Sequence, residues 1–397
     1  AANGHQAVMM APTEILAEQH FRTLCGLFGA DPDDGPVAEA TPPYLDRPLR
    51  IAFLTGSVRA AQRRAVYEQI EAGEVDIAVG THALIQQGVT FANLGFVIVD
   101  EQHRFGVMQR AALRDKSERS AHMLVMTATP IPRSLYLTLY GDLDVSVIDE
   151  LPPGRKPVET RWWPPERRQD AYDFLRAEID AGRQGFVICP LVEESEALVA
   201  KAAVQEFERL RTEVYPGLQL ELVHGRLSGK DKEAAMRRFR DGEARILVST
   251  AVVEVGIDVP NASVMLIEGA DRFGLAQLHQ FRGRVGRGAD QSYCLLLAES
   301  PSFEAQQRLR LMEETTDGFR LAEADLQMRG PGEFFGTRQS GLPDFRVASL
   351  LDTRLIELAR AEAARLLEED PGLSRPEHAA LAQVVARLFD EVTGEIH

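Results

Sequence analysis

The acidic pair Asp100-Glu101, followed by Gln102-His103, is the stretch whose residue types are best suited to chemistry. The apolar, mostly β-branched run 96–99 precedes it and predicts a strand that is buried on both faces of a parallel sheet. Because ligands bind beyond the carboxyl ends of such strands, we expect a site here. Asp100 is suited to holding Mg²⁺ through its water shell, and Glu101 to orienting or deprotonating a water. Gln102 and His103 would report the state of the site to neighbouring elements, whereas the alternative is that the pair only opens a loop or a helix.

A basic segment at residues 277–288 is the second candidate for chemistry. It contains three arginines, three glycines and no acidic residue. Interleaved glycines make a poor helix but allow the backbone to approach a phosphate, and planar guanidinium groups suit the spread charge of a phosphoryl group in transfer. We therefore favour an arginine finger that faces the acidic pair. The alternative is a solvated basic helix start.

An internal repeat suggests two lobes of one architecture. The shared order is glycine, helix, Gly-Glu, strand and threonine, and agreement at one constant offset is hard to obtain by chance. Two stacked α/β lobes would leave a cleft for a ligand that opens and closes them. Gly56, Gly73, Glu74, Ile77, Val79 and Thr81 recur 169 positions later as Gly225, Gly242, Glu243, Ile246, Val248 and Thr250.

Hydrophobic runs and turn residues place the elements that carry these segments. We expect one helix at 14–28 and a second one from Gly56-Ser57 to Ala72, with Gly73 as its cap. A loop is expected at 31–48 and a hinge at 151–157. After residue 300 we expect mostly helices, with a Gly-rich interruption at 330–341. Strands are predicted at 7–10, 51–54, 76–79, 96–99, 123–126, 185–190, 220–224, 244–249, 263–268 and 292–297.

Composition excludes several classes of protein. The 397 residues are 45% hydrophobic and 26% charged, which is ordinary for a globular chain with large cores. The three cysteines form no C-x-x-C pair and indicate neither a disulfide framework nor a zinc site, as in a reducing cytoplasm. No apolar run approaches a membrane span. The net charge of −16 argues against a protein that coats polyanions, so any nucleic-acid site must be local.

Short motifs follow one another between residues 11 and 288. They are Ala11-Pro12-Thr13-Glu14, Gly80-Thr81-His82, Asp100-Glu101-Gln102-His103, Thr127-Ala128-Thr129-Pro130, His224-Gly225, Ser249-Thr250 with Gly256-Ile257-Asp258, and Gln280 to Arg287. As an ordered set, they resemble motifs Ia to VI of superfamily 2 helicases. Residues 129–133 and 330–341 resemble the RecG family of DNA translocases, and the wording Gly-Pro-Gly-Glu and Gly-Thr-Arg-Gln favours that family over transcription-repair coupling factors.

The resemblance assigns roles to residues of the nucleotide site. Asp100 and Glu101 match the magnesium and water-activating carboxylates, with Gln102 and His103 beside them. Arg284 and Arg287 match the arginines that reach ATP from the second lobe. Gly256, Asp258 and Gln280 would line the same cleft. ATP and Mg²⁺ are therefore the implied cofactors.

The resemblance also implies contacts with DNA and a route for coupling. Hydroxyls and backbone amides suit contact with phosphates that does not depend on sequence, whereas the alternative for each threonine is a strand-end cap. Thr127, Thr129, Arg308, Arg329 and Gln339 match residues that couple hydrolysis to movement, although Arg308 alone would also suit an exposed helix position. The expected DNA-binding residues are Pro12, Thr13, Gly56, Ser57, Thr81, His82, Gly225, Arg226 and Thr250.

One departure concerns the Gly-rich phosphate loop that ends in Gly-Lys-Thr, because no such loop occurs in these residues. The nearest match, residues 225–231, has one residue too few between its glycines and is better interpreted as a helix start capped by Ser228. The family's wedge domain is also missing. We therefore expect the C-terminal part of a longer protein that begins just after the phosphate loop and that is inactive as an ATPase by itself.

The predicted fold is α/β, with two tandem RecA-like parallel-sheet lobes, the first truncated, and a mainly helical C-terminal region. The expected domains are residues 1–150, 151–299 and 300–397. The resemblance implies ATP-dependent translocation on duplex DNA that remodels forks and Holliday junctions in repair and recombination, by a monomer in the bacterial cytoplasm, at the nucleoid, with a single-stranded DNA-binding protein as a further partner. The alternatives are a transcription-repair coupling translocase and a DNA-binding or regulatory module without catalysis.

Overall fold

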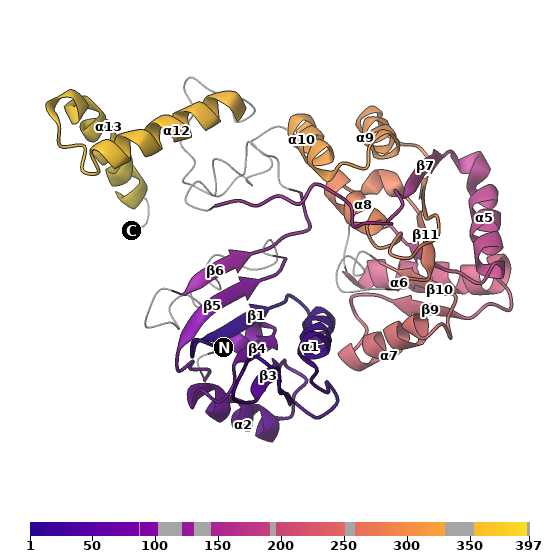
Figure 1. The fold of residues 1–397 in the computed structure, drawn as a ribbon. Coiled ribbons are helices and arrows are strands. Elements are labelled where there is room, and N and C mark those ends of the chain that lie inside the picture. Colours follow the sequence, from indigo (N-terminus) through magenta and orange to yellow (C-terminus); the bar gives the residue numbers. More distant parts are fainter. Residues whose placement is uncertain are drawn as a thin grey trace. The chain divides into compact units, whose positions relative to one another are not determined.

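The chain folds into two compact units. The computed structural model describes residues 1–86, 88–101, 121–130, 144–190, 196–250, 259–329 and 353–394. One unit holds residues 1–129, 156–272 and 280–299, and the other holds residues 130–155, 273–279 and 300–397. The first unit contains two six-stranded sheets, here named sheet A and sheet B (Figure 1).

Sheet A is built from β1 (Gln6–Met10), β2 (Val37–Ala40), β3 (Leu49–Leu54), β4 (Ile77–Gly80), β5 (Leu94–Val99) and β6 (His122–Val125). Its strand order is β2-β3-β4-β1-β5-β6. β2 is antiparallel to β3, and the other neighbours are parallel. After β1, the chain forms β2, β3 and β4 on one side of β1 and then crosses to β5 on the other side. The strand order therefore reverses between β1 and β5.

Helices cover both faces of sheet A. The first is α1 (Glu14–Phe28), whose buried Phe21 and Cys25 pack on one face with residues of β2 and β3. The second is α2 (Ala60–Glu71), which packs Val66 and Ile70 on the other face. A 3₁₀ turn, η1 (His82–Ile85), follows β4. Because side chains alternate along a strand, β3 and β4 supply buried side chains to both cores.

Sheet B is parallel throughout and has the order β7-β12-β11-β8-β10-β9. Its strands are β7 (Glu159–Trp163), β8 (Gln184–Ile188), β9 (Leu220–Val223), β10 (Ile246–Ser249), β11 (Ala262–Ile267) and β12 (Tyr293–Leu297). The helical elements around it are η3 (Pro165–Arg167), α5 (Arg168–Asp180), α6 (Glu196–Arg209), η4 (Leu210–Val214), α7 (Gly229–Arg240), η6 (Ala270–Arg272) and α8 (Leu275–Arg282).

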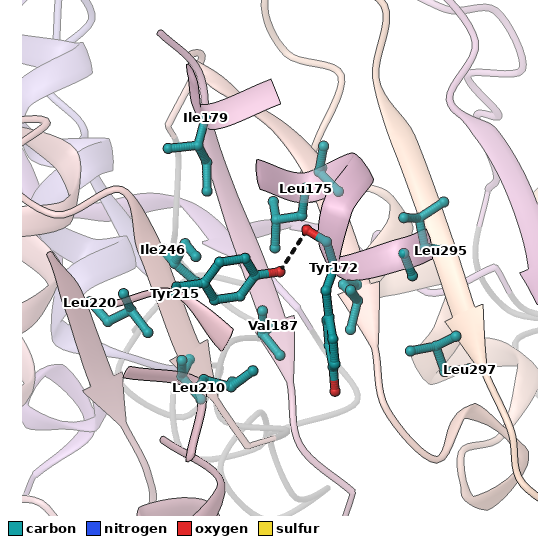
Figure 2. Packing of buried hydrophobic residues seen from close by; sticks show 14 of the residues in the cluster. Tyr172, Leu175, Ile179, Val187, Leu210, Tyr215, Leu220, Ile246, Leu295 and Leu297 are labelled. Carbon is teal, nitrogen blue, oxygen red and sulfur yellow. Dashed lines mark hydrogen bonds between the residues drawn. The ribbon is translucent and has the colours of Figure 1, made fainter. Parts of the chain in front are cut away.

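The core of sheet B includes two tyrosines among aliphatic side chains. Figure 2 shows Tyr215 pointing at the backbone of Tyr172, with Leu175, Val187 and Ile246 around them. The hydroxyl of Tyr215 donates to the carbonyl oxygen of Tyr172 at 3.2 Å, which satisfies a polar group inside the core.

The second unit is mainly helical, with α9 (Phe303–Glu314), α10 (Gly318–Arg329), α12 (Thr353–Glu369), η7 (Pro376–His378) and α13 (Ala379–Gly394). Asp370 holds the turn between α12 and η7. Its carboxylate accepts hydrogen bonds from Ser374, from the backbone amide of Arg375 and from His378. The amide of Arg375 contributes most to lowering the pKa of Asp370 below its usual range, followed by His378.

The sequence repeat is also a structural repeat, which confirms the predicted two-lobed α/β fold. Equivalent backbone amides donate to equivalent carbonyl oxygens in both sheets, with nearly equal distances. The pairs are Thr81 to Leu54 at 3.2 Å and Thr250 to Val223 at 3.3 Å, Gly73 to Ile70 and Gly242 to Phe239, both at 3.1 Å, and Glu74 to Gln69 and Glu243 to Arg238, both at 2.9 Å.

Three predictions about elements were wrong in part, and one strand was missed. The predicted loop at 31–48 contains β2, whose Ala38 and Ala40 are buried against sheet A. The strand β7 was not predicted. The helix expected from Gly56-Ser57 begins only at Ala60. The strand before the acidic pair is not buried on both faces, because Phe96 is 39% exposed while Val97 is fully buried.

Two local predictions are confirmed. α1 has the predicted bounds, and Ser228 caps α7 by accepting the amide hydrogen of Asp231. The three cysteines are free and buried. Among the described helices, none combines the length and the apolar character that a membrane span requires. The predicted boundaries at residues 150 and 299 stay predictions.

Candidate functional site

The acidic pair lies at the carboxyl end of β5, beside the end of β1. The backbone amide of Asp100 donates to the carbonyl oxygen of Met10 at 2.9 Å, which fixes the pair at the point where the strand order of sheet A reverses. In open α/β sheets this switch point is where ligands bind. The structure therefore places Asp100 and Glu101 where the sequence predicts a site.

Both carboxylates of the pair are held by named partners. Oδ1 of Asp100 accepts the amide hydrogen of Glu101 at 2.9 Å, and its Oδ2 lies 2.8 Å from Nε2 of His20 in α1. Glu101 has φ of 53°, in the left-handed region that side-chain-bearing residues rarely adopt, and it is only 5% exposed. Its Oε2 accepts the amide hydrogen of Ala128 at 3.4 Å. Strained backbone at a strand end is typical of functional sites.

The pair fits a magnesium ion that takes most of its ligands from water and phosphate. Each oxygen of Asp100 accepts one hydrogen bond and keeps a further lone pair for an outer ligand. In the part of the chain that the structure describes, no three His, Cys, Asp or Glu side chains gather to hold a metal. One or two carboxylates are sufficient for magnesium when phosphates complete its shell.

Three of the predicted DNA-binding segments follow neighbouring strands at the same edge of sheet A. Pro12-Thr13 follows β1, Gly56-Ser57 follows β3 and Thr81-His82 follows β4. The strand order therefore puts these segments on one half of the edge and Asp100-Glu101 on the other half.

A carboxylate ties two of these segments together. Oε1 of Glu14 accepts the amide hydrogen of Ser57 at 3.1 Å, and the hydroxyl of Thr13 caps α1 by accepting the amide hydrogen of Leu16 at 3.3 Å. The hydroxyl hydrogen of Thr13 is not used by this cap. Gly56 and Ser57 are both exposed, so their backbone is accessible to a phosphate.

The two threonines of the repeat are buried. Thr81 is 3% exposed and Thr250 is 2% exposed, and each closes its strand through its backbone amide. This burial favours the strand-end interpretation for the two hydroxyls, while contact with DNA stays a prediction. His82, Gly225 and Arg226 are exposed.

Gly80, the last residue of β4, is a position where the packing of the sheet needs a glycine. A Cβ atom at this position would lie 1.9 Å from the carbonyl oxygen of Leu54, which is far inside van der Waals contact. The close approach of β4 to the end of β3 therefore depends on the missing side chain.

The arginines of residues 277–288 differ in burial. Arg282 ends α8 and is buried, and this desolvation lowers the pKa of its guanidinium. Arg284 is half-buried, and Arg287 is exposed. Gln280 is half-buried in α8. Arg282 is thus a structural residue, whereas Arg287 is accessible to a ligand.

In the second lobe, the basic segment and the predicted DNA-binding residues lie at opposite edges of sheet B. Gly225-Arg226 follows β9 and Thr250 follows β10, which places them at the carboxyl edge. Cβ atoms at Gly286 and Gly288 would meet Val158 and Pro260, which precede β7 and β11. The basic segment therefore reaches the edge of sheet B at which its strands begin. That an arginine of this segment faces Asp100 stays a prediction.

The remaining predicted residues fall outside the site described so far. Thr127 and Thr129 follow β6, and Oγ1 of Thr127 accepts the amide hydrogen of Thr129 at 3.1 Å. Arg308 lies in α9 and is half-buried rather than exposed. Arg329 ends α10, but its side chain lies outside the described part. Gln102, His103, Gly256, Asp258 and Gln339 lie outside the described residues.

Comparison with known proteins assigns the chain to a family. The family described as DEAD/DEAH box helicase matches residues 1–137, and the helicase conserved C-terminal domain matches residues 167–289. ATP-dependent DNA helicase RecG, domain 3, C-terminal, matches residues 315–392. A protein of Synechocystis sp. named ATP-dependent DNA helicase RecG is 50% identical over 98% of this chain. The chain belongs to the RecG family.

Two further matches agree with this family. A Streptococcus pneumoniae protein of the same name is 50% identical over 93% of the chain. A solved structure of RecG bound to a three-way DNA junction has a TM-score of 0.67 and 45% identity, and covers 89% of this chain and 44% of its own. The chain spans about half the length of the curated relatives it matches, since it covers 45% of the Synechocystis protein and 53% of the S. pneumoniae protein.

Sequence reasoning missed His20 and Glu268. His20 falls on the sheet-facing side of α1, between Ala17 and Leu24, so a polar residue among apolar positions was the available signal. Glu268 follows β11, and its amide donates to Ile188 at 2.9 Å, in the same way that the amide of Asp100 donates to Met10. The repeat did not reveal Glu268, because Glu268 lies 168 rather than 169 positions after Asp100 and differs from it in residue type.

Proposed function

We propose that this chain is the motor part of an ATP-dependent DNA translocase of the RecG family that remodels forks and Holliday junctions in repair and recombination. The observation that carries the proposal is the carboxylate pair Asp100-Glu101 at the switch point of sheet A. Its support is the position of the DNA-binding candidates at the same edge and the identity with proteins named ATP-dependent DNA helicase RecG.

In this proposal the two carboxylates have different roles. Asp100 holds the water shell of Mg²⁺, and Glu101 orients or deprotonates the attacking water. Bound ATP and Mg²⁺ supply the reactive phosphoryl group and the charge that activates it. Arg284 and Arg287 bind the developing charge, and Gln102, His103, Gly256, Asp258 and Gln280 line the cleft.

The hydrogen bond between Glu101 and Ala128 offers a direct route for coupling. Because Ala128 lies between Thr127 and Thr129, a change at Glu101 alters the segment after β6. We propose that this segment, with Arg308, Arg329 and Gln339, transmits the state of the site to DNA. The edge formed by Pro12, Thr13, Gly56, Ser57, Thr81 and His82, together with Gly225, Arg226 and Thr250, would hold the phosphate backbone.

The proposed setting is the bacterial cytoplasm, at the nucleoid, where the protein acts as a monomer on duplex arms and meets a single-stranded DNA-binding protein. The Synechocystis and S. pneumoniae relatives carry the RecG name, and residues 315–392 match a RecG domain. These matches support RecG over a transcription-repair coupling factor and over a module without catalysis.

DNA binding by the purified 397-residue chain tests the proposal. Affinity for a three-way junction and for a linear duplex is measured over a salt series. Replacing Arg226 by Ala should weaken binding to all sequences and lower the slope of log affinity against log salt by about 1. Arg211→Ala is the control, because Arg211 is exposed and pairs with Glu208 within its own helical segment. Equal salt slopes for wild type and Arg226→Ala would contradict the assignment.

Hydrolysis tests the other half of the proposal. The 397 residues contain no Gly-Lys-Thr loop to hold the β and γ phosphates, so this chain alone should not hydrolyse ATP appreciably. The full-length gene product that contains the chain should do so, and Glu101→Gln should abolish its DNA-stimulated turnover. Turnover by the isolated chain that Glu101→Gln abolishes would disprove the first statement.

A further inference from the structure

His20 lies in the middle of α1 and reaches the carboxylate that follows β5. Its side chain is 22% exposed, and that of Asp100 is 17% exposed, so the contact between them is partly shielded from water. Nε2 of His20 lies 2.8 Å from Oδ2 of Asp100. An ionised carboxylate only accepts hydrogen bonds, so Nε2 of His20 carries the hydrogen and donates it.

With the hydrogen bond from His20, both oxygens of the Asp100 carboxylate are held by a donor. Oδ1 is already held by the amide of Glu101 at 2.9 Å. The backbone amide of Asp100 is held by Met10 at the same distance. With one donor on each oxygen, rotation of the carboxylate about its Cβ–Cγ bond breaks a hydrogen bond. His20 therefore determines which lone pairs face the edge of the sheet.

The second lobe also has a carboxylate at this strand-end position, but the side chains that hold it are different. Glu268 is the counterpart of Asp100, and its carboxylate is 7% exposed. Tyr172 donates to its Oε1 at 2.5 Å, and the guanidinium of Arg168 lies 3.1 Å from its Oε2. A carboxylate at this position is held by side chains in both lobes. In the first lobe a single side chain holds the carboxylate, which is more exposed than that of Glu268.

We propose that His20 is a positioning residue that holds Asp100 in the orientation needed to bind the water shell of Mg²⁺. The inference rests on the proposed function, because it takes Asp100 as the metal carboxylate. Groups that hydrogen-bond to a metal-binding side chain set its geometry, and their loss typically weakens metal binding about 10–100-fold.

Metal binding in the full-length gene product tests this role. Mn²⁺ is titrated in the presence of ADP and followed by electron paramagnetic resonance, and the Mg²⁺ concentration for half-maximal ATP turnover is measured on the same preparations. His20→Phe keeps a ring without a donor. His20→Gln places an amide donor near the position of Nε2, and His20→Asn carries the same amide one carbon shorter. Arg22→Ala, on an exposed part of α1, is the control, and Asp100→Asn is the reference without the metal carboxylate.

The proposal expects Mn²⁺ binding about tenfold weaker in His20→Phe and His20→Asn, near-native binding in His20→Gln and Arg22→Ala, and a matching increase in the Mg²⁺ requirement. Melting temperatures separate this result from general loss of structure. Native Mn²⁺ binding in His20→Phe and His20→Asn, with weak binding in Asp100→Asn, would overturn the role of His20 alone. Equal Mn²⁺ binding in wild type and Asp100→Asn would overturn both the metal site and the inference.

Discussion

Gln6 in β1 and Gln184 in β8 make the same pair of hydrogen bonds in their two sheets. Nε2 of Gln6 donates to the carbonyl oxygens of Ile70 and Val75 at 2.9 and 2.8 Å. Nε2 of Gln184 donates to those of Phe239 and Ala244 at 2.6 and 2.8 Å. Each buried glutamine thus holds the turn between a helix and the next strand of its lobe.

We predict that Gln6→Leu and Gln184→Leu each lower the free energy of unfolding by about 1–3 kcal/mol, because the carbonyl oxygens of Val75 and Ala244 lose their donor. The carbonyl oxygens of Ile70 and Phe239 keep the backbone amides of Gly73 and Gly242 as donors. Both side chains are buried, so water cannot replace the lost donors. Urea denaturation of each variant measures the change. Gln169→Ala is the control, because exposed Gln169 bonds only to Asp173 in the same helix and should change stability by less than about 0.5 kcal/mol. A loss in only one lobe would contradict the equivalence of the two glutamines.

A second prediction concerns the glycines in these turns. Gly73 and Gly242 have φ of 73° and 78°, in the left-handed region. Gly73→Ala and Gly242→Ala should each destabilise the chain by about 1–2 kcal/mol through backbone strain. Added Cβ atoms meet no severe clash, since the nearest atom is 3.4 Å away at Gly73 and none lies within 4 Å at Gly242. Gly26→Ala, within α1, should instead stabilise the chain by about 0.5–1 kcal/mol. Thermal unfolding decides between strain and packing.

The elements that could be predicted are those whose signals are local. The bounds of α1 follow from the Thr13 cap and the Gly29 end, and the repeat predicts both β–turn–α–Gly–β units. The strands β2 and β7 were missed for physical reasons. Two alanines provide the buried side of β2, and β7 is an edge strand whose residues Glu159 and Arg161 pair with each other. Neither strand presents the apolar run that indicates a strand in sequence.

In the candidate site, too, only the residues with a local sequence signal could be predicted. Asp100-Glu101 could be predicted because an acidic pair directly follows an apolar run. The contact of His20 with Asp100 joins residues 80 positions apart, and it depends on how α1 lies against the sheet. The burial of Thr81 and Thr250 likewise depends on packing, so their residue type suggested DNA contact without showing that the hydroxyls are covered.

Those two threonines give a third prediction, which separates DNA contact from a role in closing the strand. If both hold phosphates, Thr81→Val and Thr250→Val in the full-length gene product should weaken DNA binding similarly for all sequences. The salt dependence should stay unchanged, because a neutral hydroxyl releases no counterion. If the hydroxyls only support the strand ends, melting temperature should fall while affinity is retained. Loss of affinity for one base sequence alone would contradict both interpretations.

The last prediction concerns Glu268, whose burial raises the pKa of its carboxyl. Tyr172 donates to Glu268 and also accepts from Arg209, so Tyr172→Phe removes a donor that favours the charged carboxylate. The pKa of Glu268 should rise further in this variant. A folded-state pKa above the unfolded value means that stability is lost as pH rises through the folded value. The destabilisation by Tyr172→Phe, about 1–3 kcal/mol at neutral pH, should therefore shrink as pH falls and Glu268 binds a proton.

Tyr215→Phe is the matched control for this experiment, because it also removes one hydroxyl from the same core. Its hydroxyl donates to the carbonyl oxygen of Tyr172, a neutral acceptor that does not titrate (Figure 2). The destabilisation by Tyr215→Phe should therefore be the same at acid and neutral pH. Urea denaturation of both variants over a pH series measures the difference. Parallel pH profiles for the two variants would show that the charge of Glu268 is not what Tyr172 stabilises. The hydroxyl of Tyr172 would then matter only as a partner of Arg209.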